Sequence, residues 1–446
     1  MTQSGIAALK LSATALFAGA FAASLFFNGQ RAEYFALAMA LLTLWAVTLA
    51  WRGLTHVRPA RSAILLALAG FQSWLLLTLL WNPAPYLGAG YFWLLGCALL
   101  ICLAWASAPA EQGLWHVLRP VMLILGMALC ITALYQAFVL GEEPKATFIN
   151  RNSLAVVLNL MTLTAASALL SGWPERRGGR LLLYACIVVM SMVVGLIGSR
   201  AAFLGLSGGL ALLLALSWRL GAWRKVALIA CCAGLGVGLA TGSAQWSGKV
   251  ATALSAERLA SLGNPYSAGQ DRFIIWTRSL DMAMERPFSG YGLGSYWQWW
   301  PQWRHPADAS GGFWAHNDLL HLWVEAGAPA VALLLLVHLA VLLTAWRLLR
   351  HATLNRERKL EVAGLLAALG SVAIHAQFTF AYYTLPILML LALLIARINR
   401  LYQDTAGQST ATAAQAPAHP ATRWLVLALG MVMIGHFALT GYASAL

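Results

Sequence analysis

The sequence contains very little charge. Only 10% of its 446 residues are Asp, Glu, Lys or Arg, whereas 60% are hydrophobic and the mean hydropathy is +0.71. A soluble globular protein carries roughly 25% charged residues. A chain with so few charges cannot cover a surface that faces water. Soluble, disordered and secreted classes of protein are therefore excluded, and the chain is predicted to face lipid.

Clustered carboxylates and patterned cysteines are also lacking. No Asp-x-Asp pair occurs, and Glu142 and Glu143 are adjacent but have no evident partner. The six cysteines all lie in apolar runs without Cys-x-x-Cys or zinc-site spacing, so we interpret them as small core residues. The sequence therefore predicts neither a metal site nor a cofactor.

Long apolar runs dominate what is present. A helix that crosses a bilayer needs roughly 20 predominantly apolar residues. Such runs lie near residues 6–27, 34–51, 62–81, 88–106, 117–140, 153–171, 181–199, 201–218, 225–243, 322–346, 361–381, 385–402 and 423–442. The predicted fold is an all-α polytopic membrane protein with about 12–13 transmembrane helices. The first run contains Ala20-Phe21-Ala22, which resembles a signal-peptidase site, but we favour an uncleaved first helix.

The runs divide the chain into five segments. Residues 1–243 form a predicted N-terminal membrane bundle of about nine helices, and residues 244–321 form one long outer loop with short helices. Residues 322–402 complete the bundle. Residues 403–422, rich in Ala, Thr, Gln and Pro, are predicted to be a flexible linker before a last membrane helix in 423–446.

The distribution of basic residues predicts the orientation. The net charge is +14, and 18 of the 29 Lys and Arg residues fall in the segments that would share one side with the N-terminus. Short loops rich in Lys and Arg stay in the cytoplasm. This asymmetry predicts a cytoplasmic N-terminus and an outward-facing 244–321 loop. It also explains the positive charge without a nucleic-acid partner.

The long loop is predicted to contain a helix. Ser267-Ala-Gly-Gln270 fits a capping box, in which Ser caps the helix and Gln follows three residues later. The helix should end before Pro287, with Gly290 following.

Two arginines on this helix have different surroundings. Arg278 has Asp281 three residues later and Asp271 seven residues earlier on the same face, so local ion pairs can occupy it. Arg272 has only its sequence neighbour Asp271 as an acid and is predicted to be the freer guanidinium. It could bind lipid headgroups unspecifically or hold a specific anionic ligand, and we favour the ligand.

Glycines and tryptophans follow this helix. The Gly-x-Gly-x-Gly run at 290–294 has no preceding strand, so it does not fit a dinucleotide site. We expect it to let the chain turn tightly beneath a ligand or a helix. Four tryptophans come next and are predicted to lie at the headgroup level, with sugar stacking as the alternative: Trp297, Trp299, Trp300 and Trp303.

Two histidines precede the tenth span. If this segment is helical, His316 shares one face with three later residues, namely Leu320, Trp323 and Gly327. His321 and Glu325 lie four residues apart on another side and are predicted to form a structural pair. His316 is then the better-placed titratable group at the outer edge of the membrane.

Polar residues also interrupt the apolar runs on the side of the membrane where the long loop is predicted to lie. Ser199-Arg200 lies at a predicted hairpin tip, where Arg200 either snorkels to the interface or lines the bundle. The loop from Lys145 to Asn152 adds Arg151 and two amides. We expect both segments to line one cavity with the long loop.

At this point the sequence resembles the bacterial O-antigen ligase and polymerase superfamily, over roughly residues 120–400. The resemblance rests on four motifs: His316-Asn317 followed eleven positions on by Gly327; Arg272-x-x-x-Trp276 with Pro287 and the 290–294 glycine run; Gly198-Ser199-Arg200; and Thr147-Phe148-x-Asn150-x-Asn152. One departure is Arg151, where the superfamily more often has Pro or a small residue.

The resemblance implies a fold of the lipid-donor glycosyltransferase (GT-C-like) class and an O-antigen ligase. Such an enzyme transfers a glycan from undecaprenyl pyrophosphate to a lipid A–core oligosaccharide at the periplasmic face of the bacterial inner membrane. It also implies a metal-independent, inverting reaction without a cofactor.

The residues fit this chemistry. Arg200 and Arg272 would neutralise the pyrophosphate, because Arg binds phosphate bidentately. Neutral His316 would accept the proton of the acceptor hydroxyl. The predicted substrate-binding residues are Asn317, Arg278, Lys145, Arg151 and Asn152.

Three other functions compete with a ligase. O-antigen polymerase and protein O-oligosaccharyltransferase belong to the same superfamily. A lipid or polysaccharide transporter would instead require charged residues at mid-membrane and paired, broken helices. The polar candidates gather at the outer edge, which favours an enzyme.

Overall fold

The structure, a computed structural model, describes residues 3–53, 62–108, 113–247, 270–306, 308, 310–409 and 420–445. These residues form helices and turns, and no strand occurs among them. The helices are α1 (Gln3–Ser24), η1 (Phe26–Gly29), α2 (Ala32–Gly53), α3 (Ala63–Thr78), η2 (Leu79–Trp81), α4 (Pro85–Ser107), α5 (Leu114–Tyr135), η4 (Gln136–Leu140), α6 (Arg151–Leu170), α7 (Arg177–Ile197), α8 (Arg200–Trp218), α9 (Trp223–Ser247), α11 (Gln270–Glu285), α12 (Tyr296–Trp303), α13 (Asp318–Arg350), α14 (Arg356–His375), α15 (Leu385–Ser409) and α16 (Pro420–Ala445).

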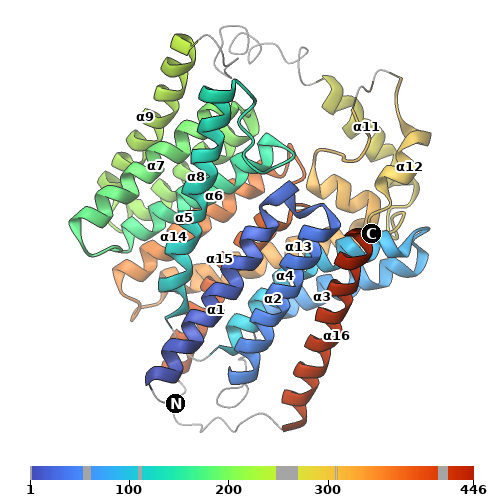
Figure 1. Cartoon of the computed structure of the whole chain (residues 1–446), viewed down its shortest axis with the longest axis horizontal. Coiled ribbons are helices and arrows are strands. Elements are labelled where there is room, and N and C mark those ends of the chain that lie inside the picture. Colours follow the sequence, from blue (N-terminus) through green and yellow to red (C-terminus); the bar gives the residue numbers. More distant parts are fainter. Residues whose placement is uncertain are drawn as a thin grey trace.

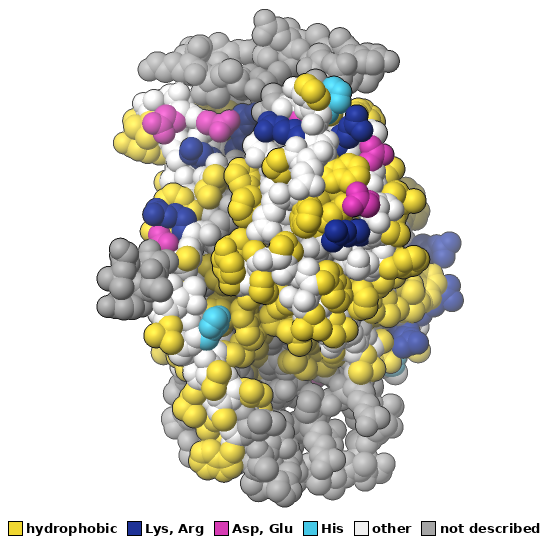
Figure 2. Space-filling view, turned by 90° about the vertical axis from the view of Figure 1, so that its right-hand side faces the viewer, with side chains coloured by type: hydrophobic (Ala, Val, Ile, Leu, Met, Phe, Trp, Pro, Cys, Tyr) yellow, Lys and Arg dark blue, Asp and Glu magenta, His cyan; other side chains and the backbone are white. Residues whose placement is uncertain are grey.

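Each of the thirteen predicted apolar runs overlaps a helix, but the 361–381 run is helical only as far as His375. Among the described residues, ten helical stretches are long and apolar enough to cross a membrane. Many large hydrophobic side chains point outward from them; Ile124 and Ile131 on α5 are 67% and 65% exposed. Figure 2 shows one face, on which hydrophobic side chains cover the middle and most charged ones gather toward the upper end. This is the surface expected of a multi-pass membrane protein.

The helices pack in two groups around buried helices. In one group α14 lies between α6 and α8, and α7 packs beside α9; in the other α13 packs on α3, α15 on α4, and α1 and α16 on α2. The whole apolar window of α6 is buried, so this helix has protein neighbours all round. Helices α11 and α12 lie at the upper right in Figure 1, whereas α1 begins at the bottom.

The last helix belongs to the bundle. Phe437 on α16 is 1% exposed, and its ring lies 5.6 Å from that of Trp93 and 6.2 Å from that of Phe35. The predicted 403–422 linker is too long, because α15 continues to Ser409 and α16 begins at Pro420. Residues 410–419 lie outside the described residues.

The helix of the long loop ends as predicted. Helix α11 extends to Glu285, just before Pro287. The predicted capping residue Ser267 lies outside the described residues, as does the side chain of Asp271.

Candidate active site

Helix α13 is broken where the glycine run meets it. Gly327 has φ 75° and ψ 173°, a conformation that is essentially restricted to glycine. Pro329 has no N–H to bond the carbonyl of Glu325. That carbonyl accepts instead from Gly292 N–H at 2.8 Å, and the carbonyl of Val324 accepts from Tyr291 N–H at 2.9 Å.

The glycine run therefore turns tightly beneath a helix. This was one of the two predicted alternatives, and a turn beneath a ligand was the other. A Cβ on Gly290 would lie 2.5 Å from the Glu325 carbonyl carbon. The close approach locks the segment after α11 onto the first turns of α13.

His321 and Glu325 form the predicted pair. Their Nε2 and Oε1 atoms lie 3.3 Å apart, and both residues are buried. Nδ1 of His321 accepts from Ala315 N–H at 3.3 Å, so in neutral His321 the proton is on Nε2, which donates to Glu325. Glu325 also accepts from Tyr296 N–H and from the Tyr383 hydroxyl, each at 3.2 Å. This network fixes the chain just before His316.

His316 does not lie on the helix, and the prediction of a shared face with Leu320 and Trp323 is wrong. Helix α13 begins at Asp318, and Asn317 caps it by accepting from Leu320 N–H at 3.0 Å. His316 precedes the cap with φ 54°, in the left-handed region. The side-chain oxygen of Asn317 is used by this cap.

The surroundings of His316 favour its neutral form. Burial, the positive charge of Arg272 and His321 lower the pKa of His316 to about 4, and Asp308 only partly opposes them. Neutral His316 can accept a hydrogen bond at physiological pH. An anion bound to Arg272 would remove part of the repulsion and raise this pKa toward its ordinary value.

Arg272 and Arg278 differ as predicted. The side chain of Arg278 is 43% exposed and pairs with Asp281 at 3.2 Å. Arg272 is half-buried and makes no ion pair with any acidic side chain that the structure describes. Burial and the positive charge of Arg200 lower the pKa of Arg272. Arg200, at the first turn of α8 after its cap Ser199, therefore lies close enough to act on Arg272.

One segment joins these elements; its first residues were predicted to belong to the span at 361–381, but they lie after the end of α14. Between α14 and α15, Phe378 contacts Trp276 of α11 with ring centroids 6.2 Å apart, and Phe380 contacts His316 at 5.9 Å. The carbonyl of Ala376 accepts from Asp318 N–H at 2.9 Å. Residues 375–383 thus form the floor on which α11, α13 and the His316 loop meet.

His375 lies at the start of this floor. It is 1% exposed, and neither ring nitrogen has a hydrogen-bond partner among the described residues. A Cβ on Gly205 of α8 would lie 3.6 Å from the Cβ of His375. An ionisable residue inside a predicted span is a functional candidate by default, and that signal was present in the sequence.

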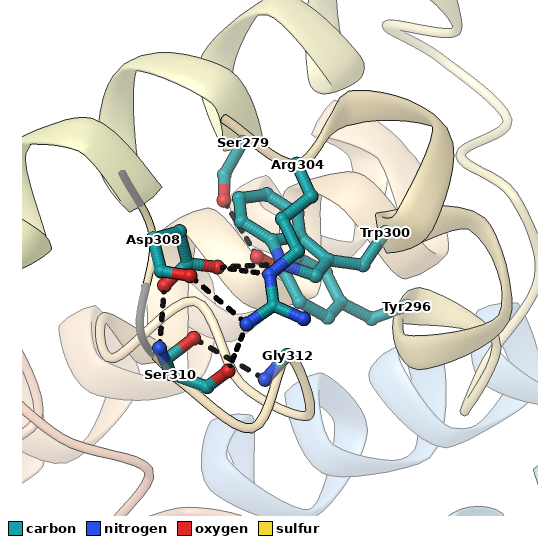
Figure 3. A network of polar contacts seen from close by, with 7 residues as sticks. All are labelled: Ser279, Tyr296, Trp300, Arg304, Asp308, Ser310 and Gly312. Atoms are coloured by element: carbon teal, nitrogen blue, oxygen red, sulfur yellow. Dashed lines mark hydrogen bonds and ion pairs between the residues drawn. The ribbon is translucent and has the colours of Figure 1, made fainter. Parts of the chain in front are cut away.

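A polar network holds α11, α12 and the following loop together (Figure 3). Asp308, with a fully buried side chain, accepts from Trp300 Nε1 at 3.1 Å and pairs with Arg304 at 3.2 Å. Ser279 of α11 bonds the Tyr296 hydroxyl of α12 at 2.9 Å. The network fixes the buried negative charge of Asp308, which acts on His316.

Trp300, one of the four tryptophans predicted to lie at the headgroup level, is enclosed by protein. Trp300 is 1% exposed and belongs to a small core between α11, α12 and α13. Trp299 and Trp303 are partly buried against the same core, and only Trp297 is exposed, at 43%.

The 145–152 loop was expected to line one cavity with the long outer loop, but its hydrogen bonds and ion pairs join it to other residues. Arg151 pairs with Glu143 at 2.6 Å, so Glu143 does have a partner. Lys145 is exposed, and Asn152 donates its backbone N–H to the cap Asn150 at 2.8 Å. The loop binds the α1–α2 turn, where Phe27 N–H donates to the Thr147 carbonyl at 2.9 Å. Within the described residues, none of its hydrogen bonds or ion pairs reaches Arg272 or His316.

An apolar cavity of about 280 Å³ opens beside the site. Its wall is made by α3, α4, α8, α13, α14 and α15, and it includes Asp318, Tyr382 and Tyr383 next to the His316 loop. Farther along, His338 bonds the Tyr382 hydroxyl at 2.9 Å. The cavity can hold part of an apolar chain whose polar end lies near His316.

A sequence model described as O-antigen ligase matches residues 185–335. This part of the chain is similar to the O-antigen ligase family. The match covers about a third of the chain and includes Arg200, Arg272, His316 and the Gly327 break. No curated protein matches the chain.

The match supports an activity of the O-antigen ligase and polymerase superfamily on lipid-linked glycans in a membrane. The part of the chain that the structure describes holds no group of three or more His, Cys, Asp or Glu residues that could bind a metal ion. The positive charge of Arg272 acts on His316, and that of Arg200 acts on Arg272.

Proposed function

We propose that this protein is an O-antigen ligase. It transfers a glycan from undecaprenyl pyrophosphate to a lipid A–core oligosaccharide at the periplasmic face of the bacterial inner membrane. The observation that carries the proposal is the convergence of Arg200, Arg272 and neutral His316 beside an apolar cavity.

The arginines act on the leaving group. When the anomeric C–O bond breaks, the electron pair and the negative charge pass to the pyrophosphate. Two guanidinium groups that repel one another are well suited to this charge, because an anion between them removes the repulsion. The adjacent cavity accommodates part of the polyprenyl chain.

His316 acts on the acceptor. Its free imidazole nitrogen accepts the proton of the attacking hydroxyl while the new C–O bond forms on the opposite face of the sugar, which inverts the anomeric configuration. General bases of this kind contribute roughly 10²–10⁴-fold to a rate. The anion bound at Arg272 would raise the pKa of His316 and so strengthen the base in the complex. The NH2 group of Asn317 positions the substrate.

The other predicted substrate contacts carry different weight. Lys145 and Asn152 could still reach a large glycan from the 145–152 loop. Arg151 and Arg278 are each held by a carboxylate, so we assign them a supporting role only.

A deletion strain tests the proposal. Lipopolysaccharide from it, analysed on a gel, should lose the whole O-antigen ladder while lipid-linked polymer accumulates. A single-repeat band would indicate a polymerase, and an unchanged ladder with unmodified glycoprotein would indicate a protein O-oligosaccharyltransferase. Complementation with the wild-type gene, but not with His316→Ala, should restore the ladder.

A further inference from the structure

A second polar pocket lies at the other end of α14. It has a volume of about 250 Å³ and is formed by the first turns of α5 and α14, the end of α6 and part of α15. Helix α14 begins in this pocket and ends at His375 in the candidate active site. Its 20 residues separate the two by roughly 30 Å at 1.5 Å per residue.

The pocket contains buried donors without acceptors. Arg119 and Trp115 are each 3% exposed, yet they line the pocket. Neither Nε nor Nη2 of Arg119, nor Nε1 of Trp115, has a hydrogen-bond partner among the described residues. Three donor nitrogens removed from water without an acceptor are unfavourable unless a ligand or ordered water bonds them.

The guanidinium of Arg119 is held in a fixed orientation. Its carbon lies 3.8 Å from the ring centroid of Trp173, so the group stacks on the indole face. Stacking leaves the N–H groups in the guanidinium plane unoccupied. These N–H groups form the planar fork that binds two oxygens of a phosphate.

The acidic side chains of the pocket do not accept hydrogen bonds from Nε and Nη2 of Arg119. Glu361 accepts from Arg397 Nε at 2.8 Å and from its Nη2 at 3.0 Å, so its two oxygens already have donors. Glu357 and Arg358 are exposed side chains of opposite charge at the start of α14. The positive charge of Arg119 therefore has no hydrogen-bonded carboxylate partner among the described residues of the pocket. The positive end of the α14 dipole lies next to the same pocket.

We propose that this pocket binds a phosphate group, supplied by the headgroup of an anionic phospholipid or by a free phosphate ion. Two oxygens would accept from Nε and Nη2 of Arg119, and a third from Nε1 of Trp115. The bound group would link α5 to the start of α14. This site is separate from the candidate active site and does not depend on the proposed function.

Thermal unfolding of the full-length protein tests the proposal. The protein is purified in detergent, stripped of lipid, and titrated with sodium phosphate at constant ionic strength or with dioctanoyl phosphatidylglycerol. The wild type should show a saturable rise in Tm. Arg119→Met should weaken the apparent affinity at least tenfold, whereas the matched control Arg219→Gln, an exposed arginine outside the pocket, should behave as the wild type does.

The two titrations distinguish the source of the phosphate. A rise with inorganic phosphate supports a free ion, and a rise with phosphatidylglycerol alone supports a lipid headgroup. No saturable rise with either, or an equal rise in Arg119→Met, would overturn the proposal. If Arg119→Met does not fold, Trp115→Phe removes only one donor and should weaken the affinity about threefold to tenfold; an unchanged affinity would refute the site.

Discussion

Arg272 and Arg278 offer a matched test on one helix. They lie six residues apart on α11, and both are partly exposed. Arg278 is paired with Asp281, whereas Arg272 has no described carboxylate partner and is repelled by Arg200. If Arg272 holds the pyrophosphate, its planar fork matters as well as its charge. Arg272→Lys should then fail almost as badly as Arg272→Ala.

The structure sets the expected magnitudes. Losing a charge-assisted contact that strengthens as charge develops on a leaving group costs about 3–4 kcal/mol, or about 10²–10³ in single-turnover rate. Arg278→Lys should cost less than about fivefold, because an exposed ion pair contributes roughly 0.2–1 kcal/mol. Arg272→Ala should not lower the Tm of the empty protein, since it removes the repulsion by Arg200.

The assay measures donor affinity and single-turnover transfer in nanodiscs with a lipid-linked glycan. Each variant is first checked for a cooperative unfolding transition. Wild-type turnover in Arg272→Lys would refute the assignment of the pyrophosphate to Arg272. Equal losses in the Arg272 and Arg278 variants would show that α11 contributes only through its general positive charge.

Four further predictions follow from the same structure. Because the lowered pKa keeps His316 neutral, kcat/KM should stay flat from pH 8 down to about pH 5 and fall only near pH 4. A fall in kcat/KM already at about pH 6.5 would contradict this assignment. Gly327→Ala should destabilise the protein by more than about 3 kcal/mol, since its Cβ would lie 2.0 Å from the Phe288 carbonyl oxygen. The control Gly234→Ala, in α9 with open space around the added Cβ, should be neutral or slightly stabilising. Equal Tm values for the two variants would refute the argument. A cysteine at the exposed Gln302 of α12 should react with an impermeant maleimide added from outside, whereas labelling only after permeabilisation would reverse the proposed orientation. Transfer should persist in excess EDTA, and an activity that Mg²⁺ or Mn²⁺ restores would exclude the metal-independent mechanism.

Local patterns in the sequence were sufficient for the helices and several polar pairs. The apolar runs predict the helices because backbone groups in lipid must bond within their own segment. Spacings of three and four residues predict the Arg278–Asp281 and His321–Glu325 pairs, since those positions are neighbours on a helix. The position of His316 could also have been predicted, because Asn317 is a favoured capping residue and a helix starts after its cap.

Tertiary structure decided the remaining features. In a membrane protein, side chains that face lipid and side chains that face other helices are both apolar, so hydropathy cannot reveal that α6 is fully enclosed. The same ambiguity concealed the burial of Trp300. The partners of His316 come from α11 and from residues 375–383, which are distant along the chain. Only the packing of α13 and α14 brings them together, because hydrogen bonds and charges act over a few ångströms of space and not along the sequence.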